Sequence, residues 1–359
     1  MAQGLEGVSG LFILRSEAQC LNRTRTKMGS SNCWPSTIPT PGILSADPLT
    51  NPHLTDWNIV FVGYCDGGSF SGHLENSITI EGTELFFRGR AVLRAVLESL
   101  LPQGLSAATD FILTGCSAGA VAAVLNCDPV QQLLHSLNVP VATRMRCMAD
   151  AGFFLNSPDI HGRPKVSEDF QKVTQLHNIS LSEECKQHPE RQQDDCFFVQ
   201  HALPFVKTPT FLVNSNTDSW SLKNVLFGNP HPRFIKKAAQ KQYIAARLAV
   251  TSFEQEALSH FSNAFRIAMQ QAIKPRIEAL NSAKEKSKRH GTFSNACLTH
   301  CQTLTSTMWQ RVRDRSGKYN IPYAFWQWYN ESLDLLPTRT FTDIFDECTY
   351  PRCNSHCGN

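Results

Sequence analysis

The sequence has few charged residues and no long apolar run. Charged residues make up 18% of its 359 positions, and 34 Lys and Arg nearly balance 31 Asp and Glu, which leaves a net charge of +3. This balance argues against nucleic acid as a partner, because binding to phosphates requires an excess of basic side chains. No stretch approaches the roughly 20 apolar residues of a membrane-spanning helix. A hydrophobic content of 42% is enough for one large core or two modest ones.

The start of the chain also lacks a recognisable export signal. Met1 to Glu17 has no basic region ahead of an apolar run, and its apolar patch, Leu11 to Leu14, is short. Thirteen cysteines and three Asn-x-Ser/Thr sequons, at Asn22, Asn178 and Asn330, nevertheless favour an oxidising compartment. We therefore expect a secreted glycoprotein whose N-terminus, as given, is incomplete or altered.

A strand, a tight turn and a helix are predicted between residues 110 and 125, D-F-I-L-T-G-C-S-A-G-A-V-A-A-V-L. The short apolar run before Gly115 predicts a buried strand, and the alanine-rich run after Gly119 predicts a helix. The turn between them fits G-x-S-x-G, and this context distinguishes a nucleophile elbow from a chance match. Ser117 is therefore the candidate nucleophile. The amide of Ala118, at the start of the helix, is the candidate donor to an oxyanion.

An acid and a base for this serine are expected farther along the chain, in the order Ser, Asp or Glu, His. Asp218 directly follows the apolar strand P-T-F-L-V-N, whereas Asp194 and Asp195 lie in a polar loop and are weaker candidates. Five histidines follow Asp218, and they are His231, His260, His290, His300 and His356. Only His300 comes directly after a plausible strand. The sequence thus predicts a catalytic triad of Ser117, Asp218 and His300.

Cysteines flank the candidate base and the candidate nucleophile. Cys297 and Cys301 could suggest a metal site, but a second pair of ligands is lacking, and disulfides or buried thiols explain them better. Cys116 is expected to be a buried free thiol. Cys185 and Cys196 are spaced to close a small loop. We expect no metal and no cofactor.

Predicted strands alternate with predicted helices, which indicates a single α/β domain with a mainly parallel sheet flanked by helices. The expected strands are 57–64, 111–114, 139–148 and 209–214, and the expected helices are 85–101, 120–125, 128–137 and much of 233–286. Four residues at helical spacing are expected in the core: Leu258, Phe261, Phe265 and Met269. Residues 1–19 form an atypical segment. Residues 20–359 form the domain, which ends in a cysteine-rich tail with Cys348, Cys353 and Cys357.

Several motifs resemble plant-type pectin acetylesterases, a family that includes Notum-type carboxylesterases, which remove a fatty acyl group from secreted signalling proteins. They are Y-C-D-G-G-S-F at Tyr64, G-C-S-A-G-A at Gly115, D-A-G-F-F-L at Asp150, N-S-N-T-D-S-W at Asn214, N-A-C-L-T-H-C-Q at Asn295 and C-T-Y-P-R-C-N-S-H-C at Cys348. The resemblance runs from about Cys20 to the C-terminus. It implies an α/β-hydrolase-like domain, an extracellular setting such as the cell wall, no metal cofactor, and a triad of Ser117, Asp218 and His300.

The two branches of this family are both represented in the sequence. Asp218-Ser219-Trp220, Cys116 and His300-Cys301-Gln302 look closer to the pectin branch, whereas Trp34-Pro35 and Gly42-Ile43-Leu44 look closer to the Notum branch.

The front of the chain departs from the family pattern. Members of the family have a strand that ends in L-E-G-G-G-W-C, whose amides help to form the oxyanion hole. Leu5-Glu6-Gly7 begins this pattern here, but Val8-Ser9-Gly10-Leu11 replaces the rest. A second oxyanion donor is therefore expected near Gly7, in a hole that is weakened or defective. The cysteine of the motif is also missing, which would leave Cys20 without its usual partner.

The triad and the resemblance together predict a secreted serine esterase that releases acetate from acetylated pectin through an acyl-enzyme on Ser117. Two alternatives stay open. One is a lipid deacylase of the Notum type, and the other is an inactive binding member with a defective oxyanion hole. The expected partner is acetylated polysaccharide or another acyl ester, with no nucleic acid. A long apolar tunnel would favour a fatty acyl substrate, and a shallow polar cleft would favour acetyl.

Overall fold

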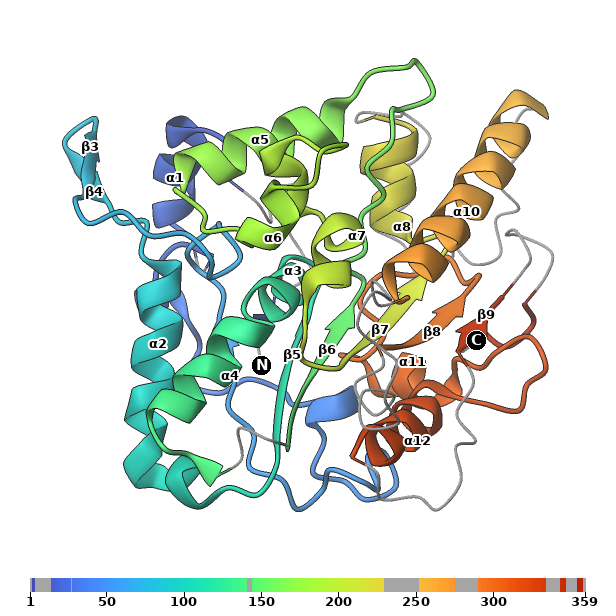
Figure 1. The fold of residues 1–359 in the computed structure, drawn as a ribbon, viewed down its shortest axis with the longest axis horizontal. Coiled ribbons are helices and arrows are strands. Elements are labelled where there is room, and N and C mark those ends of the chain that lie inside the picture. The colour runs from blue at the N-terminus through green and yellow to red at the C-terminus, as the bar shows by residue number, and fades with distance from the viewer. Residues whose placement is uncertain are drawn as a thin grey trace.

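The computed structural model describes residues 2–3, 14–26, 28–140, 144–228, 252–274, 290–333, 343–346 and 354–357. At its centre is a sheet in which every described pair of neighbouring strands is parallel, in the order β2-β1-β5-β6-β7-β8-β9 (Figure 1). The strands are β1 Ala2–Gln3, β2 Val62–Gly63, β5 Phe111–Cys116, β6 Met145–Asp150, β7 Thr210–Ser215, β8 Gly291–Asn295 and β9 Ile344–Phe345. A separate antiparallel hairpin consists of β3 Ile78–Ile80 and β4 Thr83–Leu85.

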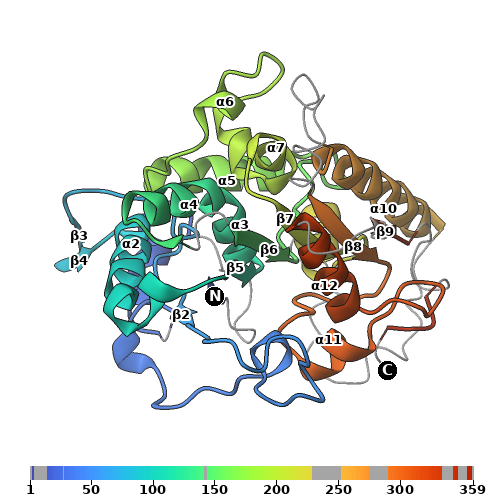
Figure 2. The ribbon, with the colours of Figure 1, turned by 60° about the horizontal axis from the view of Figure 1, so that its bottom comes forward.

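Helices cover both faces of the sheet (Figure 2). One face packs against α2 Gly89–Leu100, α3 Ala118–Leu125, α4 Cys127–Ser136, α5 Lys165–Leu176, α7 Val199–Ala202 and α10 Ser252–Ala272. The other face packs against α11 Ser306–Arg311 and α12 Ile321–Ser332. Shorter or more peripheral helices are α1 Glu17–Thr24, α6 Glu183–Lys186 and α8 Ser219–Ser221. This arrangement confirms the predicted α/β class with a mainly parallel sheet.

The two covered faces explain why the central strands are continuously apolar. Successive side chains of a strand point to opposite faces, and in β7 both faces are buried. Leu212 packs into the same cluster as Val121 of α3. Its neighbour Phe211 points the other way, where its ring centroid lies 5.5 Å from that of Phe325 and 5.2 Å from that of Trp328, both on α12. The apolar run predicted as a strand over 209–214 is therefore a buried strand.

Several other predictions are confirmed. The helix predicted over 120–125 is α3, which begins two residues earlier, and the one predicted over 128–137 is α4, one residue earlier at each end. The four predicted core residues of α10 are all buried: Leu258, Phe261, Phe265 and Met269. The predicted loop closure also occurs, because Cys185 and Cys196 form a disulfide.

The strand predicted over 57–64 is much shorter in the structure. Only Val62–Gly63 forms β2, which pairs with the two residues Ala2 and Gln3 of β1. Farther back, residues 57–60 line a cavity of about 140 Å³ together with residues 110–114 and the apolar side of α2. The prediction of a buried strand is wrong for residues 57–60. A strand forms only where a neighbouring strand pairs with it, and an apolar pattern does not specify that neighbour.

Two more boundaries differ from the prediction. The helix predicted over 85–101 begins at Gly89, because Leu85 pairs with Ile78 in the β3–β4 hairpin. Phe86 and Val92 are 54% and 41% exposed. The strand predicted over 139–148 is β6, which begins only at Met145.

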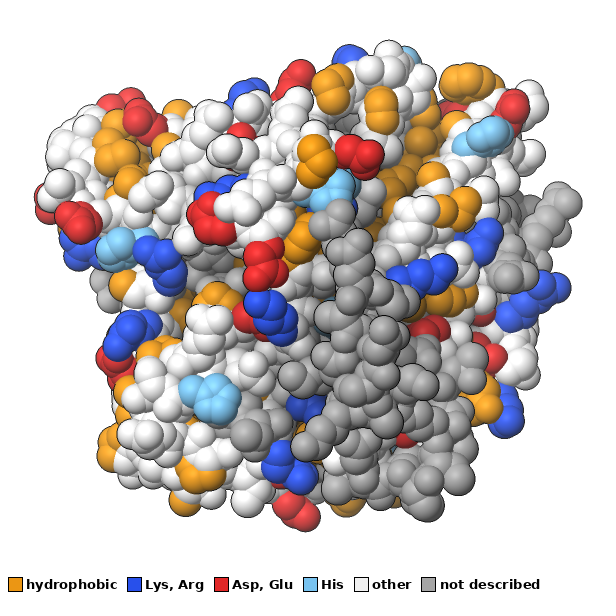
Figure 3. All heavy atoms as spheres, in the orientation of Figure 1, with side chains coloured by type: hydrophobic (Ala, Val, Ile, Leu, Met, Phe, Trp, Pro, Cys, Tyr) orange, Lys and Arg blue, Asp and Glu red, His pale blue; other side chains and the backbone are white. Residues whose placement is uncertain are grey.

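Some predicted positions lie outside the described residues, namely Gly7, His231, Cys348, Cys353 and parts of the region 233–286. On the face shown in Figure 3, Lys and Arg side chains are interspersed with Asp and Glu rather than gathered in one patch. No helix among the described residues combines the length and the apolar character needed to cross a lipid bilayer.

A buried histidine lies directly before β8. His290 is 3% exposed, and its Nδ1 accepts a hydrogen bond from the Thr210 backbone N–H at 3.2 Å. Burial lowers the pKa of His290 from 6.5 to about 4. A lowered pKa means that the unfolded chain binds the proton first, so this histidine stabilises the fold above pH 6.5 and the stabilisation is lost as the pH falls toward 4.

We predict that His290→Asn makes the protein less sensitive to acid. The Asn oxygen can still accept from Thr210, but it does not titrate. The difference in unfolding free energy between pH 7 and pH 5 should shrink by about 2 kcal/mol relative to the unchanged protein. Urea unfolding at both pH values measures this difference. His260→Asn, on the exposed side of α10, is the control and should change nothing; equal acid sensitivity of all three proteins would contradict the prediction.

Candidate active site

Ser117 lies between β5 and α3, where the sequence predicts a nucleophile elbow. Its backbone has φ 58° and ψ −122°, a conformation that is unfavourable for a residue with a side chain. Such strain costs on the order of 1–3 kcal/mol and persists only where surrounding contacts enforce it. One such contact is the Ser117 N–H, which donates to the Asp150 carbonyl at 2.8 Å. The residue is 2% exposed.

The amide of Ala118 is placed as an oxyanion donor requires. Ala118 is the first residue of α3, so its N–H has no partner within the helix. Among the described residues it donates no hydrogen bond, although Ala118 is only 1% exposed. The turn at residues 65–69 leads into Phe70, which packs in one cluster with Ala118 and Ala122.

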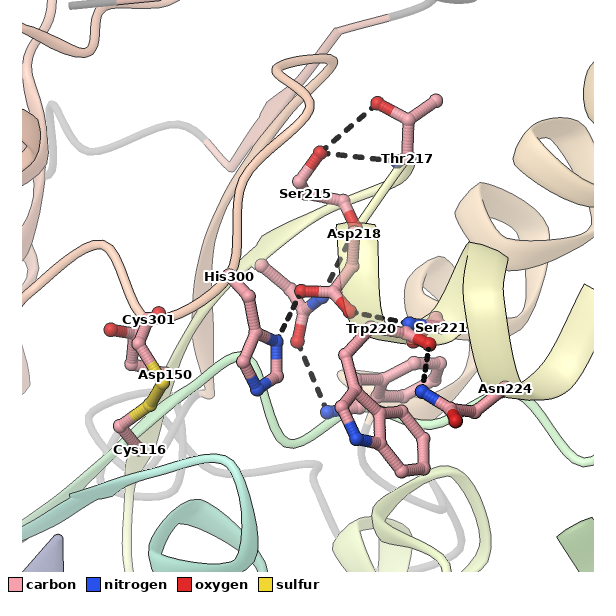
Figure 4. A network of polar contacts seen from close by, with 12 residues as sticks. Cys116, Asp150, Ser215, Thr217, Asp218, Trp220, Ser221, Asn224, His300 and Cys301 are labelled. Carbon is pink, nitrogen blue, oxygen red and sulfur yellow. Dashed lines mark hydrogen bonds and ion pairs between the residues drawn. A yellow bond between two sulfur atoms is a disulfide. The ribbon is translucent and has the colours of Figure 1, made fainter. Parts of the chain in front are cut away.

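The candidate acid lies just beyond β7. Asp218 caps α8 by accepting from the Ser221 N–H at 2.8 Å through Oδ1, and its Oδ2 lies 2.7 Å from Nδ1 of His300 (Figure 4). Both side chains are buried, with exposures of 1% and 8%. The bond from Ser221 fixes Oδ1 of the carboxylate, and Oδ2 of the same carboxylate orients the imidazole. Because Asp218 engages Nδ1, a proton exchanged with a substrate or nucleophile would pass through Nε2.

A disulfide joins the elbow to the loop that carries His300. Cys116 and Cys301 are bonded, with a Cα–Cα distance of 5.6 Å, although 185 positions separate them in sequence. Their sulfurs and a ring nitrogen of His300 all lie within 4.8 Å of one another. The prediction that Cys116 is a free thiol is therefore wrong, because the loop after β8 folds back over the end of β5. The bonded sulfurs offer no thiolate to a metal.

The disulfide interpretation of the other cysteine near His300 is confirmed. Cys297 is bonded to Cys357, with a Cα–Cα distance of 5.4 Å. Cys20, whose family partner is missing from the sequence, is a buried free thiol. Burial raises the pKa of that thiol to about 12, so it stays protonated.

Asp150 is the residue of this site that sequence reasoning missed. Its Oδ2 accepts from both the N–H and the hydroxyl of Thr303 at 2.7 Å, while its carbonyl holds Ser117. Burial raises the pKa of Asp150 to about 6. The signal was present in the sequence, because a carboxylate at the end of a buried strand is rarely placed there without a partner.

Gly152, two residues after Asp150, shows how closely the elbow is packed. A Cβ on Gly152 would come within 2.4 Å of the Ala120 side chain and 3.2 Å of the Ser117 carbonyl oxygen. The D-A-G sequence at Asp150 therefore lets β6 run close beneath the first turn of α3.

Comparisons with known proteins agree with the sequence resemblance. Residues 4–358 match the family model described as pectinacetylesterase. Pectin acetylesterase 5 of Arabidopsis thaliana is 33% identical over 343 residues, which cover 95% of this chain and 73% of that protein. Pectin acetylesterase 4 of the same plant is 32% identical, covering 98% and 78%. The human palmitoleoyl-protein carboxylesterase NOTUM is 32% identical over 375 residues, covering 97% and 66%.

We predict that the link between Cys116 and Cys301 contributes more stability than a local disulfide. Closing a longer loop removes more entropy from the unfolded chain, about 5 kcal/mol for a separation of 185 residues against about 3 kcal/mol for one of 11. Urea unfolding of Cys116→Ala/Cys301→Ala and of the control Cys185→Ala/Cys196→Ala measures the two losses.

A peptide map of the unreduced protein provides a direct check of the pairing. It should yield the two segments that contain Cys116 and Cys301 as one linked species. Alkylation of Cys116 without reduction, or a smaller loss of stability than in the control pair, would contradict the assignment.

Proposed function

Because the chain belongs to the pectinacetylesterase family, we propose that it is a serine esterase that releases acetate from acetylated pectin. The names of its relatives denote carboxylic ester hydrolases, and the chain is of that class. The observation that most strongly supports the serine mechanism is the covalent link between the strained turn at Ser117 and the His300 loop, whose imidazole is held by Asp218.

The proposed reaction has two halves. Ser117 Oγ attacks the acetyl carbonyl carbon while Nε2 of His300 takes the hydroxyl proton, and Asp218 stabilises the imidazolium. The carbonyl oxygen becomes an oxyanion that accepts from the Ala118 N–H. When the intermediate collapses, His300 gives the proton to the departing sugar oxygen, and the acetyl group remains on Ser117 as an ester. Water then attacks the acyl-enzyme by the same route and releases acetic acid.

The setting we propose is extracellular, at an acetylated polysaccharide such as that of a plant cell wall. Four disulfides join described cysteines, and such bonds persist in oxidising compartments. The likeness to pectin acetylesterases extends over 95% and 98% of the chain for the two plant relatives.

A lipid deacylase is the second candidate. Its support is the 32% identity to the human carboxylesterase named for a palmitoleoyl group, over 97% of this chain. The two candidates share the same triad and differ in the room beside it. A binding protein with a weakened oxyanion hole is the third candidate, since Val8-Ser9-Gly10-Leu11 replaces the rest of the family motif after Gly7.

We predict that Ser117→Ala abolishes ester hydrolysis and leaves the fold intact. The substitution removes the nucleophile and adds no bulk, so turnover should fall by about a thousandfold or more. Acetate release from acetylated pectin and hydrolysis of p-nitrophenyl acetate are the two assays. Ser136→Ala, at the exposed end of α4, is the control and should keep full activity. Retention of turnover in Ser117→Ala would exclude Ser117 as nucleophile, and inactivity of the unchanged protein on both esters would exclude the proposed function.

A further inference from the structure

Trp220 lies directly beside the candidate base. It is the second residue after Asp218, and its ring is stacked on that of His300 with centroids 6.4 Å apart and planes 24° from parallel. Figure 4 shows the imidazole between the Cys116–Cys301 disulfide and this indole. His300 is therefore enclosed by sulfur on one side and by an aromatic ring on the other.

The indole separates His300 from a buried aromatic cluster. Its centroid lies 4.6 Å from that of Phe154, which is 2% exposed. Phe154 packs in turn on Phe170 at 5.9 Å, and Phe170 contacts Phe198 at 4.4 Å. Trp220 is partly exposed and packs on the outside of this cluster. The apolar cluster thus begins immediately behind the Trp220 ring, on the side away from His300.

The backbone holds this ring in place. Asp218 caps the helical turn that carries Trp220, and the Trp220 carbonyl accepts from the Asn224 side chain at 2.8 Å. The indole N–H is buried and makes no hydrogen bond to another described residue. Buried tryptophans usually donate this N–H to an acceptor. No such bond to a described residue positions the Trp220 ring, so its position is set by the aromatic packing and the helical turn.

We propose that Trp220 determines acyl specificity by filling the apolar space next to His300, so that acetyl is accepted and a fatty acyl chain is excluded. This inference rests on the proposed esterase function and selects between its first two candidates. A deacylase for long chains needs an apolar pocket that opens beside the triad. Here an aromatic ring occupies that position and packs on the apolar cluster behind it.

The test compares p-nitrophenyl acetate, butyrate and octanoate as substrates. The unchanged protein should prefer acetate. Trp220→Ala removes the ring and should raise the ratio of kcat/KM for octanoate to that for acetate about tenfold or more, because several methylenes gain an apolar environment. Trp220→Phe keeps an aromatic ring but removes the N–H, and its ratio should stay within about threefold of the unchanged protein.

The control is Phe205→Ala, which loosens the same apolar cluster without touching His300. It should leave the ratio unchanged. If Trp220→Ala keeps the acetate preference of the unchanged protein, the inference is overturned while the esterase function stands. If Trp220→Ala does not fold, Trp220→Leu, which keeps an apolar contact with Phe154, takes its place with the same expected direction and the same contradicting result.

The effect of a fatty acid on Tm tests the role of Trp220 without measuring turnover. Decanoate should raise the Tm of Trp220→Ala and not that of the unchanged protein, because a ligand stabilises only the fold that can bind it. This outcome would support the inference even if the unchanged protein hydrolysed no ester, in which case the proposed function alone would fail. Equal decanoate shifts in both proteins would overturn the inference.

Discussion

Parallel pairing of β5, β6, β7 and β8 brings the carboxyl ends of these strands to one edge of the sheet, and each candidate catalytic side chain follows one of those ends. Cys116 is in register with Asp150, and Ser215 is in register with Asn295. Loops that start at these positions must share the same small region. In α/β sheets ligands bind at this edge, and a short turn after each strand is enough to assemble a site.

Proximity along the sheet edge does not by itself fix the geometry of the candidate site. Two ties, a disulfide and a set of hydrogen bonds, hold the loops in defined positions. The disulfide between Cys116 and Cys301 joins the residue before the candidate nucleophile to the residue after the candidate base. The Asp150 carboxylate holds Thr303 on the same loop, while its carbonyl holds the amide of Ser117. Ser117 and Cys301 both have positive φ, at 58° and 62°, so these ties also hold a strained backbone in place. Preorganisation of this kind lets the site act without rearranging during the reaction.

The sequence predicted those parts of the site that depend on local patterns. The motif around Ser117, with an apolar run before it and a helix former after it, was sufficient to predict the turn. Chain order then selected Asp218 and His300, which the structure places 2.7 Å apart, while their catalytic roles stay a prediction. The link from Cys116 to Cys301 was not predictable, because cysteine spacing carries no information on pairing across 185 residues. The strand predicted over 57–64 was too long for a related reason, since its length depends on the neighbouring strand and not on its own apolar side chains.

Covalent trapping with a fluorophosphonate probe tests the central claim most directly, because such a probe reacts with a serine only when a nearby base activates it. The Ser117 oxygen would displace fluoride and form a stable bond to phosphorus, and His300 would accept the proton. Peptide mapping of the native protein should find the adduct on Ser117, and His300→Ala or prior denaturation should abolish it. An adduct on another serine, or an equal yield in His300→Ala, would contradict the account.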